Sequence, residues 1–146
     1  MKCSVGIDVG SASAEALILR DGKILAYSIL ETGANSRRAA ERALEEALEK
    51  AGISRSEVGP IVATGYGRIS VDFASRQVTE ISCYARGINY LYPEVRMVID
   101  IGGQDSKAIL VGKNGRVLDF VMNDKCAAGT GRFLEVMAKV MEVKVE

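Results

Sequence analysis

The stretch Ile99-Asp100-Ile101-Gly102-Gly103-Gln104-Asp105 decides the fold, because it reads as a buried strand that runs into a glycine turn with a carboxylate at the strand end. The same form occurs near the start of the chain, at Ile7-Asp8-Val9-Gly10-Ser11. At the same offset, Ala16–Leu19 aligns with Ala108–Val111. After a shift of one residue, residues 21–27 align with residues 114–120. The sequence therefore contains an internal repeat, which has to be read before any single element is assigned.

Each copy of the repeat predicts three strands, joined first by a glycine turn and then by a tight hairpin. Asp21-Gly22 and Asn114-Gly115 are two-residue hairpin signals, because these residues supply the positive φ that such turns need. If the two copies face each other, their Asp-x-Gly turns lie on opposite sides of one cleft. Backbone N–H groups in such turns form anion-binding nests, and a carboxylate beside each can hold a hydrated Mg²⁺ ion. The repeat therefore predicts a site that grips a polyphosphate from both sides.

The rest of the chain supplies helices between and after the two copies. Apolar periodicity predicts helices at 37–51, 69–76, 81–91 and about 131–141, and strands at 3–9, 15–20, 23–30, 60–64, 95–101, 106–111 and 116–121. This order indicates an α/β protein with two ribonuclease-H-like lobes, one over residues 1–93 and a second over residues 94–146. The second lobe stops after its first helix, so the sequence suggests a truncated fragment or a chain whose remainder comes from elsewhere.

Composition excludes several classes of function. Lys plus Arg and Asp plus Glu number 19 each in the 146 residues, so no net charge favours nucleic acid or an anionic membrane. No apolar run approaches the ~20 residues that span a bilayer, and Met1-Lys2-Cys3 leads directly into a strand rather than into a signal peptide. Three cysteines, an odd number, argue for the reducing cytoplasm, and the absence of histidine excludes a histidine base or ligand within this chain.

A second stretch with chemical content runs from Asn123 to Phe133. Cys126 precedes Gly129-Thr130-Gly131 and the start of a helix, where the helix dipole and free N–H groups favour a thiolate. A thiolate is the usual ligand of iron–sulfur clusters. One cysteine cannot hold a four-iron cluster, so either further ligands come from later in the chain or two subunits share one cluster.

Each of these features also has a structural interpretation. Cys126 can be a half-buried structural thiol, Asp8 can cap a turn, and Gly129-Thr130-Gly131 can be a helix cap. Gly65-Tyr66-Gly67-Arg68 can be no more than the turn that ends a strand, and Cys3 and Cys83 fit the core. Sequence alone leaves these alternatives open.

Five motifs together resemble one family, the activators of 2-hydroxyacyl-CoA dehydratases and the ATPase subunits of benzoyl-CoA reductase. The resemblance covers essentially the whole chain in order, and its last motif is highly specific, whereas Asp-x-Gly alone is weak. The motifs are residues 6–11, 63–68, 79–83, 99–105 and 123–133.

This resemblance implies the actin-like, sugar-kinase-like ATPase fold of the Hsp70 superfamily. It also implies a homodimer or heterodimer in which one [4Fe-4S] cluster bridges the subunits and Cys126 is the first ligand. ATP binding and hydrolysis to ADP would drive a low-potential electron, supplied by ferredoxin or flavodoxin, into the dehydratase or reductase component. The first phosphate turn is matched by Asp8, Gly10, Ser11, Ala12 and Ser13, and the second by Asp100, Gly102, Gly103, Gln104 and Asp105.

Roles follow from the same resemblance. Asp8 and Asp100 would hold Mg²⁺ through waters, and Gln104 would place the attacking water, so that catalysis consists of positioning and charge stabilisation. The alternative is a redox-inert actin-like protein, either a nucleotide-binding regulatory module or a kinase of a small substrate.

The sequence also departs from the family pattern. The second cluster cysteine and the adenosine-binding glycine motif lie beyond residue 146, so this chain alone is expected to bind nucleotide poorly and to lack the cluster. Glu15 stands where the first turn of the family usually has Lys, and Tyr84 stands where a His is usual. The change at Glu15 removes a positive charge from the phosphate side.

Overall fold

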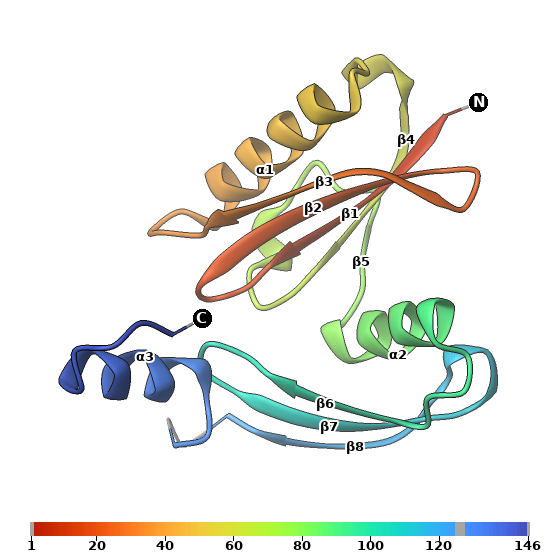
Figure 1. The fold of residues 1–146 in the computed structure, drawn as a ribbon. Helices are drawn as coiled ribbons and strands as arrows, with labels where there is room; N and C mark the ends of the chain where they lie inside the picture. The colour runs from red at the N-terminus through yellow and green to blue at the C-terminus, as the bar shows by residue number, and fades with distance from the viewer. Residues whose placement is uncertain (1, 125–127, 146) are drawn as a thin grey trace. The chain divides into compact units, whose positions relative to one another are not determined.

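The computed structural model describes residues 2–124 and 128–145 and divides the chain into two compact units, one ending at Glu80 and one beginning at Ile81. Within these residues, three α-helices and three 3₁₀ turns accompany the strands, and Figure 1 labels the helices and strands. The strands are β1 (Cys3–Val9), β2 (Ser13–Arg20), β3 (Lys23–Glu31), β4 (Val58–Thr64), β5 (Arg76–Gln77), β6 (Met97–Ile101), β7 (Ser106–Val111) and β8 (Val117–Asn123). The helical segments are α1 (Ser36–Ala51), α2 (Glu80–Leu91), α3 (Gly131–Val140), η1 (Arg55–Glu57), η2 (Arg68–Ser70) and η3 (Lys113–Gly115).

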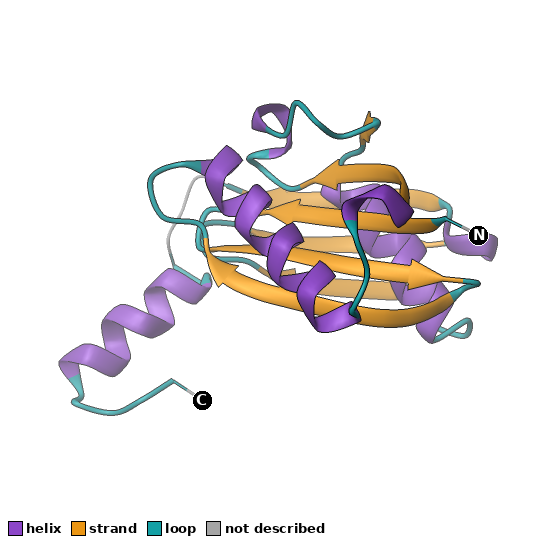
Figure 2. Ribbon diagram, turned by 90° about the horizontal axis from the view of Figure 1, so that it is seen from above, coloured by secondary structure: helices purple, strands orange, loops and turns teal. Residues whose placement is uncertain are grey.

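The first unit is a five-stranded sheet with one face covered by α1. The strand order is β3-β2-β1-β4-β5, with β1 antiparallel to β2 and parallel to β4, as in ribonuclease-H-like lobes. Helix α1 lies across one face of this sheet (Figure 2). Alternate residues of β1 are buried and belong to the core that α1 closes with a row of small side chains. They are Cys3, Val5, Ile7 and Val9 on β1, and Ala39, Ala40, Ala43, Leu44 and Ala47 on α1. Because side chains alternate along a strand, Asp8 points to the other face of the sheet.

Helix α1 begins and ends where its capping residues predict. The side chain of Asn35 accepts a hydrogen bond from the Arg38 amide at 2.9 Å, which satisfies one of the unpaired donors of the first turn. Gly52 ends the helix in the left-handed conformation at φ 63°. The predicted helix over 37–51 is therefore confirmed.

The helix predicted over 69–76 is wrong. The short 3₁₀ turn η2 forms there, a turn at Asp72 and Phe73 follows, and the chain then reaches the short strand β5, which pairs with β4. The amide of Ser75 donates to the Ile61 carbonyl at 2.8 Å, and the Ser75 hydroxyl accepts from the Ile61 amide at 3.1 Å. Pairing with the edge of β4 thus replaces the hydrogen bonds that a helix would have made within the segment.

The second unit repeats the first three strands and packs α2 on them. Its sheet has the order β6-β7-β8, and Ala85 of α2 is buried against Ile109 and Val111 of β7. Helix α2 therefore packs with the second sheet, and the boundary suggested by sequence, between residues 93 and 94, falls after this helix and stays a prediction. Helix α3 extends beyond the end of this sheet (Figures 1 and 2).

The two copies share one register. Asp8 lies opposite Glu15 in the first copy and Asp100 opposite Lys107 in the second. A bulge interrupts the pairing at the same place in both, where Leu25 is the extra residue of β3 and Leu118 the extra residue of β8. The internal repeat is therefore a repeat of backbone geometry as well as of sequence.

The two hairpin turns differ in length. Asp21 and Gly22 form the predicted two-residue turn, with φ of 54° and 72°, between the paired residues Arg20 and Lys23. The second turn is longer than predicted, because the Gly112 amide donates to the Arg116 carbonyl at 2.8 Å across η3. The additional residue explains the slip of one position between the copies.

Among the described residues, no helix has both the length and the apolar content that crossing a bilayer requires.

Candidate functional site

The first predicted phosphate turn follows β1 directly. It is closed by the Gly10 amide, which donates to the Ser13 carbonyl at 2.8 Å. Thr32, after β3, holds the turn from outside, because its hydroxyl donates to the Gly10 carbonyl at 2.9 Å and its amide to the Ala12 carbonyl at 3.0 Å. Ser11 and Ala12 are exposed at the tip. The turn is thus a short exposed loop fixed at its base, as a phosphate-binding loop requires.

A glycine loop after β4 packs against the carboxylate of Asp8. Gly65 has a φ of 83°, and a Cβ atom there would lie 2.2 Å from Oδ1 of Asp8 and 2.5 Å from the Val9 carbonyl oxygen. The Gly67 amide donates to that same carbonyl at 2.8 Å. Gly65 is therefore required by the structure for more than ending a strand, because its φ is positive and its Cα closely approaches the Asp8 carboxylate.

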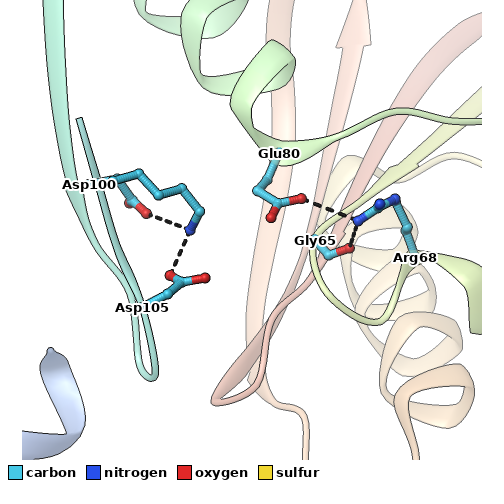
Figure 3. A network of polar contacts seen from close by, with 6 residues as sticks. Gly65, Arg68, Glu80, Asp100 and Asp105 are labelled. Atoms are coloured by element: carbon cyan, nitrogen blue, oxygen red, sulfur yellow. Dashed lines mark hydrogen bonds and ion pairs between the residues drawn. The ribbon is translucent and has the colours of Figure 1, made fainter. Parts of the chain in front are cut away.

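Arg68 holds the glycine loop in place. Its Nη1 donates to the Gly65 carbonyl at 2.9 Å and lies 3.3 Å from Oε2 of Glu80 (Figure 3). Both side chains are mostly buried, with 28% of Arg68 and 19% of Glu80 exposed. Sequence reasoning missed this ion pair, since nothing in the spacing of the two residues links them.

The second predicted phosphate turn has the same construction as the first. The Gly102 amide donates to the Asp105 carbonyl at 2.8 Å, which is the counterpart of the bond from Gly10 to Ser13. Asp100 lies at the end of β6, and Gln104 is exposed at the tip of the turn. Gly102, Gly103, Gln104 and Asp105 therefore lie in one loop, and Asp100 lies in β6 just before it.

Lys107 is a site residue that sequence reasoning did not single out. Its Nζ lies 2.6 Å from Oδ1 of Asp105 and 3.3 Å from Oδ2 of Asp100, and only 3% of its side chain is exposed (Figure 3). The ring of Tyr84, with its centroid 5.8 Å from Nζ, adds a cation–π contact. The repeat carried the signal, because Lys107 occupies the position opposite Asp100 that Glu15 occupies opposite Asp8.

The carboxylates keep Lys107 charged. Burial by itself lowers the pKa of Lys107, but the hydrogen bond and charge of Asp105 and the charge of Asp100 outweigh it, and the pKa lies above its usual value. The second turn therefore carries an ammonium group bound between two carboxylates.

This pKa predicts a loss of stability at alkaline pH. Since the pKa is higher in the folded chain, the stabilisation is complete below the unfolded value of about 10.4 and is lost as the pH rises through the folded value. Urea unfolding at a series of pH values should show this loss in the wild type and a smaller one in Lys107→Met. Equal alkaline slopes for the two proteins would contradict the assignment.

The N-terminus of α3 is bound to the second turn. The amide of Gly131 donates to the Gly102 carbonyl at 2.8 Å, and the amide of Arg132 donates to the Gly103 carbonyl at 3.2 Å. The Ser106 hydroxyl donates to the Gly129 carbonyl at 2.7 Å beside this joint. The expectation that free amides at this helix start favour a thiolate is wrong for these two groups, because the turn accepts their hydrogen bonds.

Cys126, predicted to bind the cluster, lies outside the described residues. Cys3 is a free thiol buried in the core of the first unit, as predicted. Cys83 is a free thiol that is only partly buried and is not among the residues that form the core of the second unit, so its assignment to the core stays a prediction. Within residues 2–124 and 128–145, no group of three or more His, Cys, Asp and Glu side chains is placed to hold a metal ion.

Comparisons with known proteins identify the class. Residues 5–146 match the BadF/BadG/BcrA/BcrD ATPase family. The activator of lactoyl-CoA dehydratase of Anaerotignum propionicum is 51% identical over 144 residues, which are 98% of this chain and 55% of that protein. This chain therefore belongs to the BadF/BadG/BcrA/BcrD ATPase family, and the resemblance seen in its motifs is confirmed at that level.

Solved structures support the same class of protein. The crystal structure of (R)-2-hydroxyglutaryl-CoA dehydratase component A of Acidaminococcus fermentans matches with a TM-score of 0.93 and 46% identity over 99% of this chain and 56% of that one. The activator of 2-hydroxyisocaproyl-CoA dehydratase from Clostridium difficile, with bound ADPNP, matches with a TM-score of 0.90 and 46% identity over 97% of this chain and 53% of that one. A hexokinase from Thermus thermophilus, at 16% identity and a TM-score of 0.58, covers 99% of this chain and 65% of that one and shows the fold alone.

The predicted fold class, actin-like and sugar-kinase-like, is thus confirmed. The chain spans about half the length of the curated relatives it matches, with 55% of the lactoyl-CoA dehydratase activator covered.

Proposed function

We propose that this chain is the N-terminal part of an ATP-hydrolysing iron–sulfur activator that passes a low-potential electron to a 2-hydroxyacyl-CoA dehydratase or a benzoyl-CoA reductase-type partner. The observation that carries the proposal is the joint between the second turn and α3, in which two turn carbonyls accept hydrogen bonds from the first two amides of the helix. A change of the turn on nucleotide binding is transmitted through these bonds to the helix, and Cys126 lies a few residues before that helix in sequence.

The two turns bind the phosphates of ATP or ADP. Their exposed tips and closed bases support this role, because successive backbone N–H groups in such loops form anion nests. Gly10, Ser11, Ala12 and Ser13 form the first nest, and Gly102, Gly103, Gln104 and Asp105 form the second. Asp8 and Asp100 hold hydrated Mg²⁺, and Gln104, exposed at its tip, orients the attacking water.

The cluster and the partners follow from family membership and the motif around Cys126. A second activator subunit supplies further thiolates, so that one [4Fe-4S] cluster bridges the pair, and a ferredoxin or flavodoxin supplies the electron. The protein acts in the cytoplasm, where thiols such as Cys3 and Cys83 stay reduced.

Iron analysis of anaerobically purified protein tests the proposal. We expect the complete protein to contain a [4Fe-4S] cluster, Cys126→Ser to lose it, and the matched variant Cys83→Ser to retain it. In the same samples, a fluorescent ADP analogue should bind, and the spectrum of the cluster should change when ATP is added.

Two results would contradict the proposal. A complete protein that folds and binds nucleotide but contains no iron would favour the redox-inert nucleotide-binding module. Dehydratase activation that is unchanged in Cys126→Ser would do the same, because the electron would then not pass through this thiol.

A further inference from the structure

The loop after β4 lies against the carboxylate that precedes the first turn. A Cβ atom on Gly65 would lie 2.2 Å from Oδ1 of Asp8, so no free space separates the loop from this carboxylate. The Gly67 amide donates to the Val9 carbonyl at 2.8 Å and fixes the loop to the end of β1. Because packed groups transmit a displacement to their neighbours, a shift of Asp8 toward Gly65 displaces the loop.

Arg68 connects this loop to helix α2. Its Nη1 donates to the Gly65 carbonyl at 2.9 Å and lies 3.3 Å from Oε2 of Glu80, the residue at which α2 begins (Figure 3). Both side chains are mostly buried, so solvent screens this pair less than the half-exposed pairs that Arg37 forms. The position of the loop therefore depends on the position of the first residue of α2.

Helix α2 extends this series of contacts to the second turn. Glu80 is the last residue of the first unit and Ile81 the first of the second, so the helix belongs to both. Residues four apart are neighbours on one face of a helix, which places Tyr84 one turn after Glu80. The centroid of the Tyr84 ring lies 5.8 Å from Nζ of Lys107, and that Nζ lies 2.6 Å from Oδ1 of Asp105. The contacts that begin at the first turn therefore end at the second.

We propose that Arg68 and Glu80 are positioning residues that couple the two predicted phosphate turns through helix α2. A change of conformation at one turn then alters the other, and coupling of this kind is reciprocal. The consequence for nucleotide binding rests on the function proposed above: Arg68 and Glu80 raise the affinity for ATP or ADP by limiting the conformations of each turn, without touching the phosphates.

Amide hydrogen exchange of the nucleotide-free complete protein, followed by NMR, tests the coupling. Arg68→Met should speed exchange of the Gly67 amide in its own unit and, by about fivefold or more, exchange of the Gly102 amide in the second unit. Each rate is compared with the rates of the α1 amides, which report a general loss of stability. The matched control is Arg37→Met, which removes half-exposed ion pairs of the same unit and should leave the Gly102 amide unchanged.

A second variant separates the ion pair from the other contacts of Arg68. Glu80→Gln should speed exchange of the Gly102 amide to the same extent, and the double variant should do no more than either alone, because both substitutions remove one interaction. Exchange at Gly102 that stays as in the wild type, or additive effects of the two substitutions, would overturn the inference. If Arg68→Met does not fold, Glu80→Gln and Arg68→Lys, which keeps the charge but lacks the planar fork, decide by the same criterion.

Binding of a fluorescent ADP analogue is measured on the same proteins. The wild type should bind it, and Arg68→Met should bind it about fivefold more weakly. Equal affinities would overturn the stated consequence for nucleotide binding. Faster exchange at Gly102 in Arg68→Met, with a folded wild type that binds no analogue, would contradict the proposed function and leave the coupling of the turns standing. Binding of the analogue by the wild type, with exchange at Gly102 unchanged in Arg68→Met, would contradict the coupling and leave the proposed function standing.

Discussion

Alanine substitution at Gly65 is expected to lower the free energy of unfolding by about 3 to 5 kcal/mol, because it combines strain at a positive φ with a clash against backbone and a carboxylate. The new Cβ would lie 2.5 Å from the Val9 carbonyl oxygen and 2.2 Å from Oδ1 of Asp8, and φ is 83°. The Asp8 carboxylate would have to move, so ADP binding by the first turn should also weaken. Urea denaturation and ADP binding measure the two effects.

Two other glycines separate the causes. Gly33 has a φ of 60° with nothing within 4 Å of the added Cβ, so Gly33→Ala should show the backbone strain alone, about 1 kcal/mol. Gly6 lies within β1, also with nothing within 4 Å, and Gly6→Ala should be close to neutral. If Gly65→Ala lowered the free energy of unfolding no more than Gly33→Ala does, the close approach to Asp8 would not be rigid.

Replacement of Lys107 by methionine is expected to cost about 2 to 4 kcal/mol, because it leaves two carboxylates without their cation in a mostly buried place. The estimate lies below that for a fully buried pair, since 20% of Asp100 and 28% of Asp105 remain exposed. The second turn and the start of α3 should loosen together, because the turn carbonyls hold the first amides of the helix. Denaturation gives the free energy, and hydrogen exchange of the Gly131 and Arg132 amides reports the joint.

The controls use a second lysine and a second substitution. Lys113 is exposed in the turn before β8, and Lys113→Met should change the free energy of unfolding by less than about 0.5 kcal/mol. Adding Asp105→Asn to Lys107→Met removes one of the uncompensated charges and should recover part of the loss. Additive costs for these two substitutions would show that the ion pair contributes nothing of its own.

The fold could be predicted from sequence because it depends on local patterns that occur twice. Alternating apolar residues before Asp8 and Asp100, glycines after them and the Asp21-Gly22 turn each specify local backbone geometry. The same reasoning failed over 69–76, where the hydrogen bonds of Ser75 are made with β4 and not within the segment. Tertiary pairing outweighed local preference there.

The candidate site was predicted in part. Each turn could be assigned to its strand end, but nothing in the sequence links Arg68 to Glu80, which pair only in the folded unit. Lys107 was also missed, although it contacts carboxylates of its own hairpin. Of these residues, Lys107 was the easiest to find from sequence, because the register of the first copy transfers to the second. Whether the two turns serve one nucleotide remains the prediction made from the repeat.

The shared bulge at Leu25 and Leu118 affects the shape of both hairpins. A bulge increases the local right-handed twist of its strand, so each sheet coils at the corresponding point. The copies differ in the turn at η3 and in the residue opposite the aspartate, which is Glu15 in the first copy and Lys107 in the second. The two aspartates therefore end strands of matching curvature, while the residues opposite them carry opposite charges.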